Sequence, residues 1–210
     1  MMHDFKEVIS MKSFLTMFKD SSKEFENVRS LTITAIFIAI SMVIEKFTIN
    51  LPFTKINFAF LAIAVIGMLT GPVMGFVAGM ICDIVGFLVN PTGAFMPIFT
   101  IIAGLQGLIY GILLYRKQEN FCIGKLSENV SLSIRAVIAR VLDVVIINLF
   151  LNTYFTVKLG FIPNKTFTMV LEGKLVKNLL EMVIDIPLLV LLLPAVIVIY
   201  KKTITNRHSV

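Results

Sequence analysis

Polar and ionisable side chains occur inside long apolar stretches of this 210-residue chain, where their burial is costly and marks a functional site by default. Asn148 and Asn152 are one helical turn apart, as are Glu181 and Asp185, so each pair shares a helix face. Such groups can hydrogen-bond to a polar ring, or they can bond to one another and hold helices together. The full set is Asp83, Thr100, Gln106, Asn148, Asn152, Glu181 and Asp185.

Aromatic and basic residues close to these stretches add the chemistry of ring stacking and anion binding. Phe53 and Phe95 can stack on a flat ring or close over it, and nearby lysines can attract carboxylates. We therefore predict a pocket for a planar heterocycle that carries negative charge. Its predicted residues are Phe53, Lys55, Asp83, Phe95, Thr100, Gln106, Asn148, Asn152, Lys174 and Lys177.

The elements that position these residues are predicted to be membrane-spanning helices. Apolar residues make up 57% of the chain, and its mean hydropathy is +0.91, whereas average usage is roughly 45–50% apolar. We predict an all-α integral membrane protein built as a six-transmembrane-helix bundle. The expected spans are about 30–47, 56–70, 73–89, 97–115, 133–157 and 178–200.

The distribution of Lys and Arg orients these spans. Placing both termini in the cytoplasm puts most basic residues in the inner segments, as the positive-inside rule requires. Residues 1–29 then form a cytoplasmic segment, either an interfacial amphipathic helix or a frayed tail. Residues 30–200 form the transmembrane substrate-binding domain, and residues 201–210 form a cytoplasmic tail.

Composition also excludes several function classes. The formal net charge is +6, but the basic residues lie at the ends of apolar blocks, so we expect no nucleic-acid partner. Cys82 and Cys122 give no disulfide framework. His3 and His208 lie in the tails, so we expect neither a histidine-based catalytic site nor a metal site. No Walker-type loop is present, and we expect no catalytic residues.

Other charged and small residues are predicted to be structural. Arg140 and Asp143 share a helix face and are expected to form an ion pair, and Glu45 and Lys46 are expected to mark the membrane interface. Small residues recur at four-residue spacing, which suits either packing inside the bundle or docking of a partner's helices. These residues are Ala35 and Ala39, then Gly71, Gly75 and Gly79, then Ala103, Gly107 and Gly111.

One stretch of sequence resembles a known family. Residues Gly67 to Tyr115 read GMLTGPVMGFVAGMICDIVGFLVNPTGAFMPIFTIIAGLQGLIYGILLY, and they resemble the substrate-binding S component of energy-coupling factor (ECF) vitamin transporters, in particular the folate-specific type. Supporting stretches are LTITAIFIAIS, Lys55-Ile56-Asn57-Phe58, NLFLNTYF and KLVKNLLEMVIDIPL. The resemblance covers about residues 30–200.

The resemblance implies a multi-pass protein of the bacterial plasma membrane that captures a vitamin from outside. Such a protein delivers its cargo with a separate transmembrane coupling protein and two ATPase subunits; it binds no cofactor itself, and ATP is used by the partners. Ala35 and Ala39 match the small-residue motif that docks the coupling protein. Family members often carry Arg where this chain has Lys174. Glu181 and Asp185 either pair with Lys177 or face the donor edge of the ring.

The predicted function is therefore capture of folate, without catalysis by this chain. One alternative keeps the family and changes the cargo to riboflavin or thiamin. Another is an intramembrane enzyme that uses Asp83 with Glu181 or Asp185 for acid–base chemistry. A third is a self-sufficient secondary transporter, but no inverted repeat is evident between the two halves of the chain.

Overall fold

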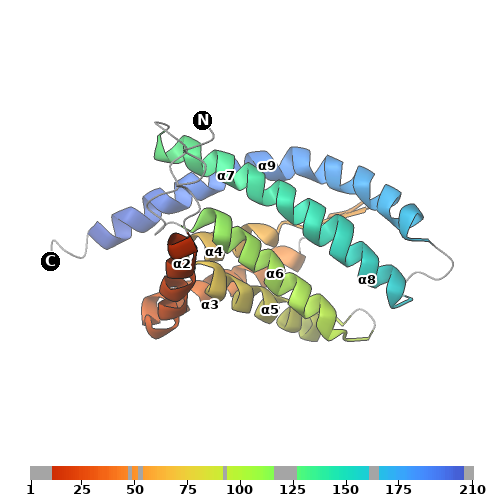
Figure 1. Ribbon diagram of the computed structural model, residues 1–210, viewed down its shortest axis with the longest axis horizontal. Coiled ribbons are helices and arrows are strands. Elements are labelled where there is room, and N and C mark those ends of the chain that lie inside the picture. The colour runs from red at the N-terminus through yellow and green to blue at the C-terminus, as the bar shows by residue number, and fades with distance from the viewer. Residues whose placement is uncertain are drawn as a thin grey trace.

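The computed structural model describes residues 11–46, 49–51, 54–91, 94–115, 127–160 and 166–205 (Figure 1). Within these residues almost every element is helical. In chain order they are α2 (Met11–Lys23), the 3-10 helix η1 (Glu24–Glu26), α3 (Val28–Lys46), strands β1 (Ile49–Leu51) and β2 (Thr54–Ile56), α4 (Phe60–Thr70), α5 (Pro72–Val89), α6 (Pro97–Leu114), α7 (Glu128–Leu142), the π-helix η2 (Asp143–Leu151), α8 (Asn152–Lys158) and α9 (Phe167–Thr205).

Four of these helices are long and apolar enough to cross a membrane, namely α3, α5, α6 and α9. The prediction of a helical membrane bundle is confirmed at this level. The fifth predicted span corresponds to α7, η2 and α8, which follow one another without a gap from Glu128 to Lys158. Helix α9 begins at Phe167, well before the predicted start of the sixth span. Its first turns contain charged residues that favour helices, such as Glu172 and Lys174, and these lower the hydropathy on which the predicted start was based.

The short second span, α4, is shielded by its neighbours. Every residue from Ala62 to Thr70 is buried, and the helix packs against α3, α5, α6 and α9. Because α4 is enclosed by protein, it needs no amphipathic pattern and is apolar on all sides. It ends where Gly71, at φ 88°, turns the chain into α5. Pro72 follows as the first residue of that helix, a position that suits proline.

Glycines allow α5 and α6 to pack at unusually short range. A Cβ atom on Gly107 would lie 2.0 Å from the carbonyl oxygen of Gly75, and one on Gly79 would lie 2.2 Å from that of Ala103. A Cβ atom on Gly111 would lie 2.3 Å from the Cα of Pro72. These two small-residue stretches therefore serve packing inside the bundle.

The arrangement leaves α7, η2, α8 and α9 along one side of the molecule and α4, α5 and α6 along the other (Figure 1). Between α3 and α4, an antiparallel hairpin pairs Asn50 with Lys55. The all-α prediction did not include this hairpin, whose strands have only three residues each. Such short strands give too few alternating positions to be recognised from sequence.

Candidate functional site

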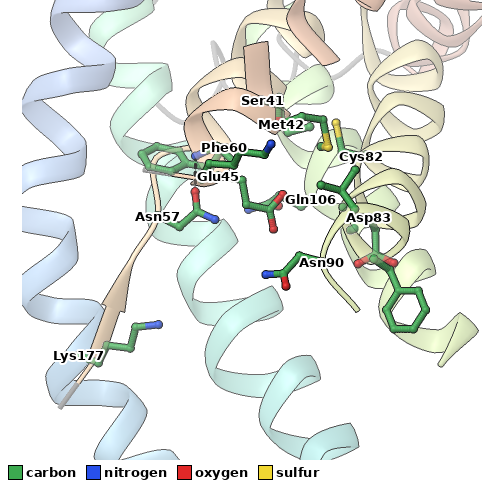
Figure 2. Close-up of a pocket in the computed structure, with 18 residues that line it drawn as sticks. Ser41, Met42, Glu45, Asn57, Phe60, Cys82, Asp83, Asn90, Gln106 and Lys177 are labelled. Atoms are coloured by element: carbon green, nitrogen blue, oxygen red, sulfur yellow. Dashed lines mark hydrogen bonds between the residues drawn. The ribbon is translucent and has the colours of Figure 1, made fainter. Parts of the chain in front are cut away.

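A cavity of about 880 Å³ is lined mainly by residues of α3, α4, α5 and α6, and α9 contributes Lys177 to its wall. This volume is within the range of about 300–1,000 Å³ that is typical of small-molecule sites. Figure 2 shows the side chains of Glu45, Asn57 and Asn90 pointing toward the middle of this space, with Lys177 entering from α9 on the other side. The polar and charged residues of its wall are Ser41, Glu45, Lys46, Asn57, Asp83, Asn90, Gln106 and Lys177.

Four predicted site residues come together at this cavity. Asp83, Gln106 and Lys177 line it. Thr100 is buried behind Asp83, and its hydroxyl donates a hydrogen bond of 2.6 Å to Asp83 Oδ2. Residue types on three different helices thus converge, because α5 and α6 pack closely enough for Thr100 to reach the Asp83 carboxylate.

Glu45 and Lys46 are not confined to the membrane interface as the sequence analysis expected, because both line the cavity. They occupy the last turn of α3, which ends beside α5: a Cβ atom on Gly86 would lie 3.1 Å from Glu45 Oε2. A charged residue at the end of an apolar span can either mark the membrane interface or line a cavity, so sequence alone did not distinguish the two. The missing signal was the small residue opposite, Gly86, which makes room for the Glu45 carboxylate.

Asn57 and Asn90 were also missed. Asn57 accepts a hydrogen bond of 2.7 Å at Oδ1 from the backbone N–H of Ala59, and this interaction fixes the chain just before α4. Asn90 follows the last residue of α5, and its backbone N–H donates to the carbonyl of Gly86. Both residues resemble ordinary helix-end residues in sequence. Only the fold shows that they also face the cavity.

The aromatic part of the site differs from the predicted one. Phe60 and Phe87 line the cavity. Phe95 lies beyond Phe87, with ring centroids 5.1 Å apart and a tilt of 55°, and it is 43% exposed. Phe53 lies outside the described residues.

Other predicted site residues lie elsewhere. Asn148 is in η2 and Asn152 begins α8, and neither is among the described residues that line the cavity. Their spacing was interpreted as one α-helical turn, but Asn148 belongs to a π-helical segment. Lys174 is half-buried on α9, three residues before the cavity residue Lys177. Lys55 is in β2, of which the structure describes the backbone.

The expected ion pair of Arg140 and Asp143 is confirmed, with Nη1 2.6 Å from Asp143 Oδ2. The same guanidinium also pairs with Asp185, which was expected to face the pocket or Lys177. Glu181 does pair with Lys177, at 3.5 Å. Gln106 connects this buried cluster to the cavity, because its amide donates a 3.0 Å hydrogen bond to Asp143 Oδ2.

The site is suited to binding. Two carboxylates, two ammonium groups and several amides can satisfy the donors and acceptors of a polar ligand, and the aromatic rings can cover its flat faces. Within the part of the chain that the structure describes, no group of three or more His, Cys, Asp or Glu side chains could hold a metal ion.

Comparison with known proteins places the chain among vitamin transporters. The family described as "ECF-type riboflavin transporter, S component" matches residues 25–194. The chain is similar to the folate transporter FolT of Clostridium novyi (strain NT), with 29% identity over 146 residues, which are 69% of this chain and 76% of that protein. It is 35% identical over 104 residues to FolT of Streptococcus mutans serotype c; this alignment covers 49% of the chain and about half, 54%, of the relative.

A solved structure shows the same likeness in three dimensions. The crystal structure of FolT bound with folic acid superimposes with a TM-score of 0.60 and 26% sequence identity. The superposition covers 81% of this chain and 93% of that one.

Proposed function

This chain belongs to the family of ECF-type transporter S components described for riboflavin, and on that basis we propose that it is a substrate-binding subunit that captures folate. Membership of a transporter family confirms that the chain is not an enzyme, and it excludes the intramembrane carboxylate enzyme considered above. The observation that carries the choice of folate is the likeness to FolT bound with folic acid, which spans nearly all of that protein.

The alternative cargo is riboflavin, because the family description names it. Charge favours folate. Folate has a glutamate tail with two carboxylates, whereas riboflavin carries no comparable anionic tail. Lys46 and Lys177 line the cavity and can attract such carboxylates. Lys55 and Lys174 are further candidates for this role.

Within the cavity we assign the ring end of folate to the polar wall formed by α5 and α6. Asp83 accepts from ring N–H groups while Thr100 holds its carboxylate in place, and the Gln106 amide can donate and accept. Phe87 packs against one face of the ring. Phe95 packs against Phe87, and we call these two residues the aromatic wall. Asn148, Asn152 and Phe53 remain candidate contacts in a conformation closed around the ligand.

The partners are those of an ECF module: a transmembrane coupling protein and two ATPase subunits, which use the ATP. Ala35 and Ala39 are exposed on α3, next to the exposed side chain of Ile36. This smooth surface supports docking of a partner's helices. We assign the chain six spans, with Glu128–Lys158 as the fifth, and place it in a bacterial plasma membrane with both termini in the cytoplasm.

A calorimetric titration of the purified, ligand-free protein tests the cargo. We expect tight 1:1 binding of folate and no heat from riboflavin or thiamin. Lys177→Gln is expected to weaken folate binding about tenfold, which corresponds to about 1.4 kcal/mol. The control Lys201→Gln removes a lysine that pairs with Glu128 far from the cavity, and its affinity should be unchanged. Binding of riboflavin instead of folate would keep the family and refute the assigned cargo.

Copurification with the coupling protein tests the docking surface. We expect Ala39→Leu to abolish the association while folate affinity stays the same, since Ala39 is exposed on α3 and is not among the described residues that line the cavity. Val198→Phe enlarges an exposed side chain on α9 and serves as the control. Equal loss of association in both variants would show a general packing defect and argue against docking through α3.

A further inference from the structure

A buried ionic cluster joins α7, η2 and α9 beneath the cavity. Arg140 Nη1 donates to Asp143 Oδ2 at 2.6 Å, and Arg140 Nη2 donates to Asp185 Oδ2 at 2.5 Å. The side chains of the three residues are 5%, 0% and 1% exposed, in that order. Folate capture as proposed above uses none of the three directly.

The cluster contains one positive and two negative groups, which leaves one negative charge in the protein interior. The described groups that face it from other helices do not offset this charge. Tyr110 donates its hydroxyl to Asp143 Oδ2 at 3.2 Å, and Gln106 contributes a neutral amide from α6. The Phe60 ring of α4 lies 4.0 Å from the Arg140 guanidinium carbon.

On α9 the nearest charges cancel each other. Glu181 lies one turn before Asp185 and pairs with Lys177 at 3.5 Å, so this carboxylate and this ammonium group add no net charge. Lys174 precedes Lys177 by three residues and lies further from Asp185 along the helix. Among the described side chains no counter-charge faces this negative charge. A buried charge without a counter-charge is strongly unfavourable, so the cluster requires one more positive charge.

Three buried polar atoms of the cluster have no hydrogen-bond partner among the described residues, namely Asp143 Oδ1, Asp185 Oδ1 and Arg140 Nε. Of these, the two carboxylate oxygens are the atoms that can take up a proton. An ionised carboxylate can only accept hydrogen bonds, whereas a protonated one carries a donor of its own. The described residues contain no group of three or more His, Cys, Asp or Glu side chains that could hold a metal ion.

We propose that Asp143 and Asp185 together bind one proton, which makes the cluster with Arg140 electrically neutral. The site is a proton-binding site in the ligand-free protein, and it does not depend on which vitamin is captured. Its proton is linked to the cavity, because Gln106 lines the cavity and donates to the same Asp143 oxygen that binds Arg140.

Infrared spectroscopy of the full-length, ligand-free protein at neutral pH tests this proposal. The chain has five aspartates, namely Asp4, Asp20, Asp83, Asp143 and Asp185. We expect a carbonyl band of a protonated carboxylic acid that shifts when the protein is labelled with [4-13C]aspartate. The same band should not shift with [5-13C]glutamate. Absence of any aspartate-dependent band would overturn the proposal without the need for a variant.

Variants then locate the proton. Asp143→Asn and Asp185→Asn should each remove the band, because a single remaining carboxylate can pair with Arg140 in its ionised form. The triple variant Asp4→Asn, Asp20→Asn, Asp83→Asn leaves the buried pair as the only aspartates and should keep the band. This variant retains the whole Arg140 cluster, so it remains informative even if the buried substitutions prevent folding. Loss of the band in the triple variant would assign the proton elsewhere and refute the site.

Discussion

The two ends of the bundle use the same types of polar residue for different purposes. At the end opposite the cavity, polar side chains satisfy backbone groups where helices stop. Ser21 Oγ donates to the carbonyl of Thr70 at 3.0 Å and accepts from the N–H of Val73 at 3.0 Å. Arg135 Nε donates to the carbonyl of Leu113 at 2.6 Å. These contacts satisfy the backbone groups that helix ends leave without intrahelical partners.

We call this end of the bundle the sealed end and define it by Ser21, Glu24, Ser30, Thr70, Tyr115 and Arg135. Side chains there also form hydrogen bonds with one another. Glu24 accepts from the hydroxyl of Ser30 at 2.5 Å and from that of Tyr115 at 3.4 Å. At the cavity end, by contrast, Glu45, Asn57 and Asn90 also lie at or next to helix ends, yet they line a large space. The comparison indicates that polar residues at one end stabilise the fold, while those at the other end line the space that we propose for a ligand.

The largest effect on stability and binding should come from a change in the packing of α5 against α6, which extends between the two ends. Gly107→Ala would place a Cβ atom 2.0 Å from the carbonyl oxygen of Gly75, so α5 and α6 must separate. We expect a loss of about 3 kcal/mol of unfolding free energy, together with weaker folate binding. Denaturant unfolding in detergent measures the first effect. Gly173→Ala is the control, since a Cβ atom there has no neighbour within 4 Å. Equal stability of the two variants would contradict the close packing.

The next largest effect should separate the two ends. Arg135→Gln removes charge-assisted hydrogen bonds to the carbonyls of Leu113 and Tyr115 at the sealed end. We expect the unfolding free energy to fall by about 2 kcal/mol, while folate affinity changes less than twofold. Lys201→Gln removes an exposed ion pair with Glu128 and should cost less than about 0.5 kcal/mol. A large loss of affinity in Arg135→Gln with unchanged stability would reverse the proposed roles of the two ends.

At the cavity end, removal of a charge should affect folate binding more than the unfolding free energy. Asp83→Asn keeps an oxygen that can accept from Thr100 but removes the negative charge. We expect folate affinity to fall about tenfold, or about 1.4 kcal/mol, and the unfolding free energy to change by less than about 0.5 kcal/mol. Calorimetry and denaturant unfolding measure the two quantities. Asp20→Asn, at an exposed pair with Lys23, is the matched control.

The helices were predictable from sequence because each long apolar block carries its own signal. The starts of α5 and α6 agree with the prediction to within one residue, since Pro72 and Pro97 mark them. The hairpin and the early start of α9 were not predictable. The hairpin strands are too short to show an alternating pattern, and the first residues of α9 are not uniformly apolar. Signals within each segment therefore predicted the starts of α5 and α6 but not these two features.

The candidate site was only partly predictable, since convergence depends on packing between distant elements. Asp83 and Gln106 could be identified because a polar residue inside an apolar helix is conspicuous. Glu45 could not, because a charged residue at the end of a span is ordinary. Asp185 was conspicuous, but the sequence left open whether it pairs with Lys177 or faces the ligand, and the fold pairs it with Arg140 from another helix. Sequence reveals which side chains are costly, and only the fold reveals what each one contacts.

The smallest effect should come from the edge of the aromatic wall. Phe95→Ala removes a half-exposed ring that packs against Phe87, which lines the cavity. An aromatic pair contributes about 0.5–1.5 kcal/mol, so we expect folate to dissociate a few-fold faster while the unfolding midpoint stays the same. Stopped-flow dissociation measures this rate. Phe25→Ala removes a comparably exposed ring near the sealed end and should leave dissociation unchanged. If both substitutions changed the dissociation rate equally, the aromatic wall would have no special relation to the ligand, and the division between the two ends would not extend to their aromatic residues.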